Sequence, residues 1–306
     1  MSGIFWHIFV FSAIFLFLIL MAYRILAITR LPVHLRWELA PIPHEKGRGR
    51  YGGSYLEEYE WWRKPRRRSR LAPVVYMVGE IFLLKGIWKN NRTLWPFSFS
   101  LHAGIYLLVF TAILSIINAL FIITGVSGSI LNVFQNITSI VAVAGYLLGS
   151  LGTIGLIFKR AIDVNLRLFS SFSTYFRLVL LGTVFVSGCF AWFYTGDLAS
   201  GLGLFVKRLF TLNAGISATL PLATHIILSL LFIIYLPLTD MAHFITKYFT
   251  YHAVRWNDAP KNEKMVQELE GLLDQPVSWS AAHVKADGRK NWVELTAKKT
   301  DDDKEA

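Results

Sequence analysis

Long apolar stretches separated by short polar segments dominate the chain. Five of them are long enough to cross a membrane, since a helix needs about 20 apolar residues to span a hydrocarbon core of about 30 Å. The five stretches cover residues 4–28, 99–124, 130–158, 175–195 and 216–249. The pattern predicts an all-α membrane protein, a bundle of five transmembrane helices, and the first span is expected to be retained rather than cleaved as a signal peptide.

Two of these spans have a further pattern. The fifth is longer than one crossing requires, which predicts a tilted helix or an interfacial turn near Leu220 and Pro221. The third carries a series of glycines. They are Gly145, Gly149, Gly152 and Gly155. Small residues on one helix face predict close packing against a neighbouring helix.

Basic residues gather in the loops on one side of the predicted bundle. The loop of residues 31–97 holds 13 Lys and Arg against 6 Asp and Glu, and the run Arg63–Arg70 dominates that excess. The opposite loops, residues 125–129 and 196–215, carry few charges. By the positive-inside rule the N-terminus lies outside and the C-terminus in the cytoplasm. Residues 1–249 are therefore expected to form the membrane domain and residues 250–306 a soluble cytoplasmic tail.

Composition narrows the possible chemistry. Of the 306 residues 54% are hydrophobic, and the net charge of +11 lies in loops where a membrane protein keeps its basic residues, so nucleic-acid binding is not expected. The single cysteine, Cys189, excludes disulfides within the chain, cysteine-ligated zinc and an iron–sulfur cluster held by this chain. No nucleotide-binding or zinc-protease motif occurs. A redox centre must therefore use histidine or belong to a partner.

One segment of the basic loop is itself apolar. Val74–Trp88 places apolar and polar residues at helical spacing, which predicts a short amphipathic helix. It is expected either to lie along the membrane surface or to dock a partner.

Four of the eight histidines, His7, His102, His225 and His243, lie within predicted spans. A histidine in a membrane is costly unless it is paired or ligating, so each is a functional hypothesis, although a carbonyl or hydroxyl can also satisfy a single ring. His225 and His243 are 18 residues apart on the fifth span. Five helical turns, about 27 Å, would place them on one helix face, one near each membrane surface.

His102 is expected to face His243. Both lie near the cytoplasmic ends of antiparallel spans, the arrangement that a heme with two histidine ligands requires. Gly104 is expected to leave room for the flat macrocycle. Asp240 is expected to orient His243 as a hydrogen-bond acceptor, or alternatively to cap the interface or pair with Lys247.

These features resemble the cytochrome b (gamma) subunit of respiratory nitrate reductase. The shared features are five spans, an outside N-terminus, a histidine early in span two and the paired histidines of span five. Local sequences are similar to one branch of that superfamily, the membrane cytochromes of heterodisulfide-reductase-like and sulfite-reduction-associated redox complexes. They are Leu84–Trp88, Leu101–Gly104, His243–Phe249 and Arg255–Trp256. The resemblance covers residues 4–256.

The resemblance implies a subunit of a respiratory oxidoreductase in a prokaryotic cytoplasmic membrane. It implies heme b, one or two per chain, and chemistry with menaquinone or another quinone. It also implies a cytoplasmic iron–sulfur subunit as partner, with further membrane or multiheme cytochrome c subunits as additional ones. The Arg63–Arg70 run and the tail from Tyr251 onward are the expected docking surface, although the basic run could instead bind anionic lipid.

The chain departs from that family at the outer heme. The family's second histidine of span two is replaced by Ala112, so His225 lacks its usual partner. His7 lies at a depth that could match His225. Three alternatives follow: a heme between His7 and His225, which we favour from the sequence, a site with an unusual ligand, or a quinone pocket in which His225 binds a carbonyl.

The outer halves of spans two and five also carry polar residues that suit a quinone. A quinone ring needs an apolar cleft with one or two hydrogen-bonding groups. The candidates are Ser115, Asn118, Thr224 and His225. The competing hypothesis is a non-redox transporter or membrane anchor with structural histidines, against which the chain shows no inverted repeat.

Overall fold

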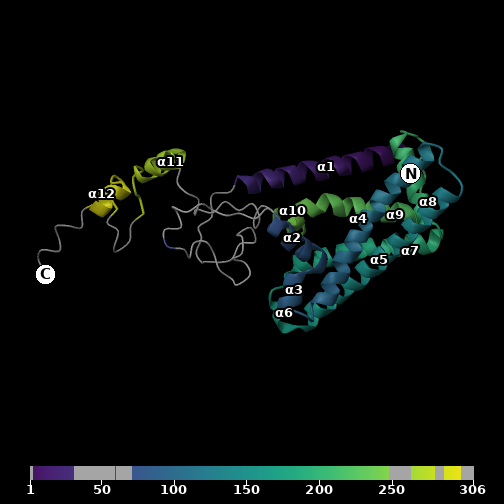
Figure 1. Ribbon diagram of the computed structural model, residues 1–306, viewed down its shortest axis with the longest axis horizontal. Coiled ribbons are helices and arrows are strands. Elements are labelled where there is room, and N and C mark those ends of the chain that lie inside the picture. Colours follow the sequence, from purple (N-terminus) through teal and green to yellow (C-terminus); the bar gives the residue numbers. More distant parts are fainter. Residues whose placement is uncertain (1–2, 31–58, 60–70, 248–262, 280–285, 298–306) are drawn as a thin grey trace, which may run out of the picture. The chain divides into compact units, whose positions relative to one another are not determined.

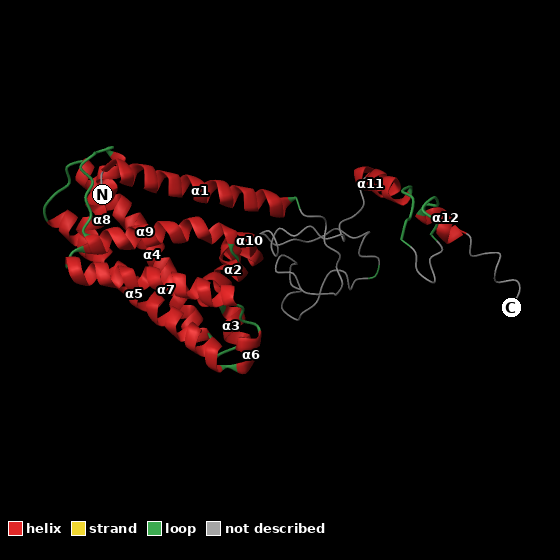
Figure 2. Cartoon of the chain, turned by 180° about the vertical axis from the view of Figure 1, so that it is seen from behind, coloured by secondary structure: helices red, strands yellow, loops and turns green. Residues whose placement is uncertain are grey.

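The computed structural model describes residues 3–30, 59, 71–247, 263–279 and 286–297. Within this part every regular element is a helix (Figures 1 and 2). The helices fall into two units. One contains α1 to α10, and the other contains α11 (Glu263–Leu273) and α12 (Trp292–Ala297).

Five helical segments are long and apolar enough to cross a membrane, which confirms the predicted five-helix bundle of a multi-pass membrane protein. They are α1 (Gly3–Thr29), α4 (Trp95–Ile123), α5 (Ser129–Ile162), α7 (Phe172–Thr195) and α9 (Leu220–Tyr235) with the 3-10 turn Leu236–Leu238 that follows it. Consecutive spans α4 and α5 run antiparallel and pack along their length, and α5 also packs on α7.

Shorter helices connect the spans. They are α2 (Leu71–Leu83), α3 (Lys85–Asn90), α6 (Val164–Leu168), α8 (Leu198–Phe210) and α10 (His243–Lys247). Helix α8 occupies what the sequence predicted as a loop. Asp197 caps it by accepting from the backbone N–H of Ser200, and the spacing of Leu198, Phe205 and Leu209 buries one face against the bundle.

Glycines bring α4 and α5 into backbone contact, as the third span's pattern predicted. A Cβ on Gly104 would lie 2.5 Å from the backbone nitrogen of Gly149, and one on Gly152 would lie 2.3 Å from that of Leu101. Gly149 also makes room for the fully buried ring of Phe185. The expectation that Gly104 leaves space for a macrocycle is therefore wrong, because α5 fills that space.

The fifth span is not one continuous helix, contrary to expectation. Helix α9 ends at Tyr235, Thr239 is extended (φ −118°, ψ 172°), and α10 begins at His243 after a second 3-10 turn. Pro237 explains the break, because proline has no N–H to donate and its ring clashes with the carbonyl four residues earlier. His225 and His243 thus do not share a helix face. Helix α9 begins at Leu220, with Pro221 in its first turn.

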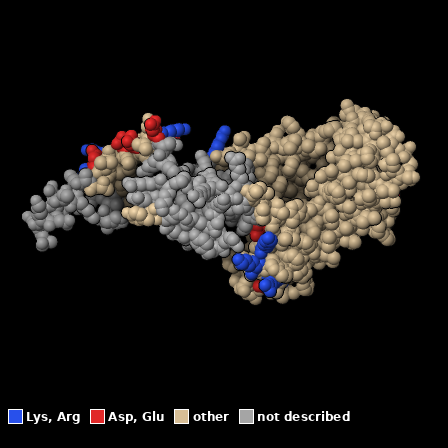
Figure 3. All heavy atoms as spheres, viewed as in Figure 1, with Lys and Arg blue, Asp and Glu red and all other residues tan. Residues whose placement is uncertain are grey.

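Charged side chains gather at one end of the bundle. Figure 3 shows Lys and Arg near α3 and α6, while the visible sides of the spanning helices are uncharged. This matches one basic end, as the loop charges predict. The Arg63–Arg70 run, which carries most of the predicted charge, lies outside the described residues.

The second unit contains a short closed turn. Val277 and Lys290 are joined by a backbone hydrogen bond of 2.9 Å, and Gly288 donates to Val277 at 3.1 Å. Backbone N–H groups of Arg289 and Lys290 donate to the Asp287 carboxylate and hold its pKa well below the usual range.

We predict that Gly104→Ala lowers the stability of the bundle, because its Cβ would overlap the backbone of α5. Overpacking typically costs about 1–3 kcal/mol, and we expect an apparent Tm lower by at least about 4 °C. Thermal unfolding in detergent measures it. Gly201→Ala is the matched control, since its Cβ would meet only the Leu222 side chain at 3.4 Å. Equal Tm values for the two variants would contradict the packing assignment.

Candidate functional site

His102 lies two turns into α4 with its ring held by its own helix. Its Nδ1–H donates to the carbonyl oxygen of Ser98 at 2.7 Å. Among the described residues nothing hydrogen-bonds Nε2, so its lone pair is available. Metal-ligating histidines usually show this pattern, because a bond at one nitrogen fixes the tautomer and orientation of the other.

His243, the first residue of α10, shows the same pattern. Its Nδ1–H donates to the carbonyl oxygen of Asp240 at 3.1 Å. The ring centroids of His102 and His243 lie 6.2 Å apart, with 59° between the ring planes. The structure thus brings together the two histidines that the sequence singled out as partners.

The spacing of this pair fits one iron atom. A metal bound about 2 Å from a nitrogen of each ring places the two ring centroids about 6 Å apart. Two histidines from facing helices form the donor set that a bundle offers to a heme. A structural zinc needs four ligands, and the described residues contain no cluster of three or more His, Cys, Asp and Glu. The pair therefore fits a heme better than it fits a zinc ion.

The break in the fifth span places His243 beside His102. Helix α1 supports it, because Arg24 donates from a guanidinium nitrogen to the carbonyl oxygen of Pro237 at 2.9 Å. Thr239 donates to the Leu236 carbonyl and accepts from the backbone N–H of Met241. Two carbonyls at the break, those of Leu236 and Pro237, thus find donors, as the interior of a membrane requires.

Asp240 acts on His243 through its backbone, not through its carboxylate. The carboxylate pairs with Arg177 of α7 at 3.1 Å, while the carbonyl accepts from the imidazole. The predicted role in orienting His243 is thus filled by the main chain. The ion pair with Arg177 was not foreseen, and it connects the His243 segment to α7.

His225 is buried in a polar network between α5, α7 and α9. Its Nε2 lies 2.9 Å from the Tyr146 hydroxyl and its Nδ1 3.0 Å from the Ser187 hydroxyl. Ser187 donates to the Val184 carbonyl, so the consistent assignment has Nδ1–H donating to Ser187 and Tyr146 donating to Nε2. The opposite tautomer would need Ser187 and Tyr146 only to rotate their hydroxyl hydrogens.

This network does not fit a heme at the outer site. Both nitrogens of His225 are occupied, and ligation would have to break a buried hydrogen bond. His7 has a buried Nε2 with no hydrogen-bond partner, and its Nδ1–H donates to Gly3. Among the described residues no hydrogen bond or ring contact joins His7 to His225. The arrangement favours the alternative in which His225 acts as a hydrogen-bonding group.

The other predicted quinone residues do not converge on His225. Ser115 is buried and donates to the Thr111 carbonyl of its own helix. Asn118, fully buried, donates to Thr138 of α5, and its carbonyl oxygen has no partner. Thr224 is exposed on α9 and donates to its own helix. Of the four, His225 alone belongs to the Tyr146 network.

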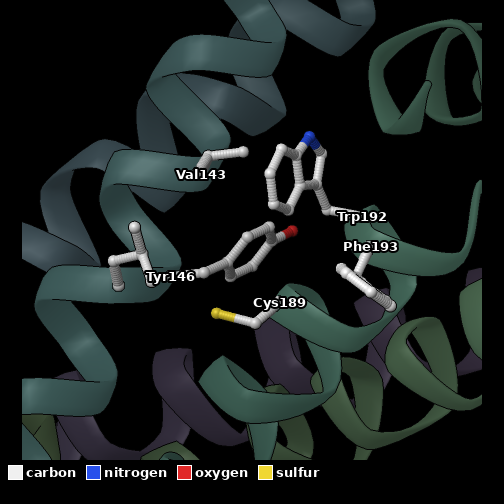
Figure 4. A pocket seen from close by; sticks show the side chains of 6 residues that line it. Val143, Tyr146, Cys189, Trp192 and Phe193 are labelled. Carbon is white, nitrogen blue, oxygen red and sulfur yellow. The ribbon is translucent and has the colours of Figure 1, made fainter. Parts of the chain in front are cut away.

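A small apolar cavity of about 180 Å³ adjoins this network. The Tyr146 ring forms one wall, with Cys189, Trp192 and Phe193 of α7 around it (Figure 4). Ligand pockets usually measure roughly 300–1,000 Å³. The cavity is thus large enough for part of a ring or chain, not for a whole quinone.

Sequence reasoning missed Tyr146, Ser187, Arg24 and Arg177. The two arginines were visible as charges near span ends, where each could be read as snorkelling to the surface. Tyr146 and Ser187 carried no signal, since each is a single polar residue in an apolar helix whose partner depends on tertiary packing.

Comparisons with known proteins give no further identification. No family model, no curated protein and no solved structure matches the chain.

We predict that the Arg177–Asp240 pair positions His243. Asp240→Lys places two cations together and should move the segment, so that heme bound after purification falls at least twofold. Exchanging the charges in Arg177→Glu/Asp240→Lys should restore it. Glu268→Lys is the control, because Glu268 is an exposed carboxylate paired with Lys264 at 3.8 Å. Heme content from the pyridine hemochrome spectrum measures the effect, and full retention in Asp240→Lys would refute the assignment.

Proposed function

We propose that this protein is the heme b membrane subunit of a respiratory oxidoreductase complex. It would transfer electrons between a quinone in the membrane and a cytoplasmic iron–sulfur subunit. Bound between His102 and His243, the heme would supply one-electron transfer. The chain's own residues hold the two imidazoles in place through their Nδ1 atoms.

The single observation that carries the proposal is the His102–His243 pair. Two histidines 141 residues apart in sequence come within 6.2 Å, each with Nδ1 bonded to a backbone carbonyl. Among the described residues neither Nε2 has a hydrogen-bond partner, so both nitrogens remain able to bind iron.

The quinone would act at the outer half of the bundle beside His225. A quinone presents a carbonyl acceptor and a quinol presents a hydroxyl donor at the same atom. The Tyr146–His225–Ser187 network can present either polarity through its two tautomers. Menaquinone and other quinones share this property, so the network does not select between them.

The cytoplasmic partner would dock on the basic loop and the tail. Trp279 and Trp292 of the tail are exposed in the second unit. Tryptophan is enriched in protein interfaces, which favours a protein partner over lipid for this part of the chain. The Arg63–Arg70 run belongs to the same proposed surface.

The alternative is a non-redox transporter or anchor subunit. The His225 network is compatible with this alternative, because a structural histidine is also expected to be fully hydrogen-bonded. The His102–His243 pair does not favour the alternative. An absorbance spectrum of the purified chain distinguishes the heme subunit from the non-redox protein. A colourless protein from heme-replete cells would refute our proposal.

We predict that His102→Ala and His243→Ala each remove the same heme. Wild-type protein should show low-spin b-type bands, and each variant should lose one heme equivalent. His7→Ala should leave that equivalent in place, because His7 lies in a different part of the bundle. Hemochrome quantification and electron paramagnetic resonance measure it. Unchanged low-spin heme in both variants would overturn the ligand assignment.

We predict that His225→Ala spares the heme and weakens quinol use. The apparent KM for decylubiquinol should rise at least tenfold, with an unchanged low-spin spectrum, because a hydrogen-bonding group is lost and no ligand is. Tyr146→Phe should raise it as well, whereas Tyr194→Phe, a substitution at an exposed site, should not. Loss of a heme equivalent in His225→Ala would instead support the outer-heme alternative.

A further inference from the structure

Helix α2 is too short to span a membrane and too apolar to lie in water. Its 13 residues, Leu71–Leu83, contain one charged residue, Glu80. An apolar helix of 10–14 residues is typical of a buried core helix or of a segment that enters the membrane without crossing it. Core burial is excluded here, since Val75, Val78 and Phe82 are 68%, 50% and 57% exposed.

The exposed residues form a continuous stripe. Val74, Val75, Val78 and Phe82 recur at the spacing of one helix face, and each has at least half of its surface uncovered by the protein. A soluble protein rarely leaves such a stripe in contact with water. Something apolar therefore covers it.

The end of α2 is attached to a membrane-spanning helix. The Tyr106 hydroxyl donates to the Ile81 carbonyl at 2.7 Å, and Trp95 Nε1–H donates to the Leu83 carbonyl at 2.8 Å. Tyr106 lies about 16 Å along the axis of α4 from Trp95, at 1.5 Å per residue. Side chains of a helix point back toward its N-terminus. The Tyr106 hydroxyl therefore lies closer to the beginning of α4 than its Cα does, and it holds Ile81 beside the first turns of the span.

Those two bonds also satisfy groups that lipid cannot. The last four carbonyls of a helix have no partner within it, and an unsatisfied carbonyl in hydrocarbon costs several kcal/mol. Side chains of α4 donate to two of these carbonyls of α2, at Ile81 and Leu83. Donors supplied by a span therefore hold this end of α2 against the first turns of α4.

The residues that follow α2 are of the types found at the membrane–water interface. Lys85, Lys89 and Arg92 follow directly, with Trp88 packed against Trp95 at 4.8 Å. Basic residues with tryptophan are typical of the headgroup level.

The Lys85 side chain folds back along the end of α2. Its Cδ, Cε and Nζ each lie 2.9 Å from the position that a Cβ on Gly79 would take.

We propose that α2 lies in the leaflet at which α4 begins, with the stripe of Val74, Val75, Val78 and Phe82 against lipid acyl chains. The ligand of this surface is the lipid itself, not a protein. The inference stands on contacts outside the histidine pair and does not require a cofactor.

One consequence concerns the candidate heme site. Phe82 packs on the Tyr106 ring at 5.6 Å, and that ring lies 6.3 Å from the His102 ring. An inserted α2 therefore forms a wall next to His102 on the lipid side. It would separate that histidine from the surrounding bilayer.

Spin-label accessibility tests the proposal in the full chain. Cys189 is the only cysteine, so Cys189→Ser provides a background in which single cysteines are placed at Val78 and at Phe82. The purified chain, labelled and reconstituted into phosphatidylcholine–phosphatidylglycerol vesicles, is exposed to oxygen, which concentrates in hydrocarbon, or to a water-soluble nickel chelate. Ile116→Cys on the lipid-facing side of α4 and Lys89→Cys near the expected surface are the controls.

We expect both α2 labels to resemble Ile116→Cys, with an oxygen-to-nickel accessibility ratio at least threefold above that of Lys89→Cys. A nickel-accessible α2 would overturn the proposal. Labels protected from both reagents would overturn it too, because a protein partner or a second copy would then cover the stripe.

Tyr106→Phe supplies an independent check. It keeps the ring and removes the donor to Ile81, so the end of α2 should move toward the surface. The ratio at the Phe82 label should fall at least twofold, while the ratio at Ile116 should not change. An unchanged Phe82 ratio would show that the Tyr106 bond does not hold α2 in the leaflet. Heme content measured on the same samples reports separately on the proposed function.

Discussion

The constraint on which this structure depends is that a backbone in hydrocarbon must satisfy every N–H and C=O within the protein. Five spanning helices meet it along most of their length. The remaining sites are where helices end or break, and there the chain supplies side-chain donors. Arg24 serves the Pro237 carbonyl, and Tyr106 and Trp95 serve the end of α2. These three side-chain donors therefore lie where regular helix stops.

The same constraint explains how the candidate site is built. A proline in the fifth span opens the helix and frees carbonyls, and the segment that repairs the break presents His243 toward α4. Arg24 from α1 and Arg177 from α7 both bind this segment. Two neighbouring helices thereby help to determine where one imidazole lies. On the other side His102 needs only its own helix, because a continuous α4 supplies the Ser98 carbonyl.

The five spans could be predicted because apolar length is a property of each segment alone. The His102–His243 pair could be predicted because depth in a membrane is fixed by counting residues from a span's end. Counting failed at Pro237, where the axis is interrupted and the relation between His225 and His243 is lost. The partners of His225 could not be predicted, because Tyr146 and Ser187 come from other helices and their position depends on how α5 and α7 pack. The prediction for Gly104 was wrong for the same reason. A glycine indicates that some group approaches the helix closely, but it does not identify that group as a cofactor or as a neighbouring helix.

The break between α9 and α10 also separates the two histidines mechanically. In a continuous helix, a rotation that adjusted His243 would turn His225 with it and strain its bonds to Tyr146 and Ser187. The extended residue Thr239 can absorb such a rotation in its own backbone dihedrals. Small adjustments at one end of the fifth span therefore need not be transmitted to the other. Helices α9 and α10 can therefore adjust separately, so that a change around one histidine leaves the hydrogen bonds of the other in place.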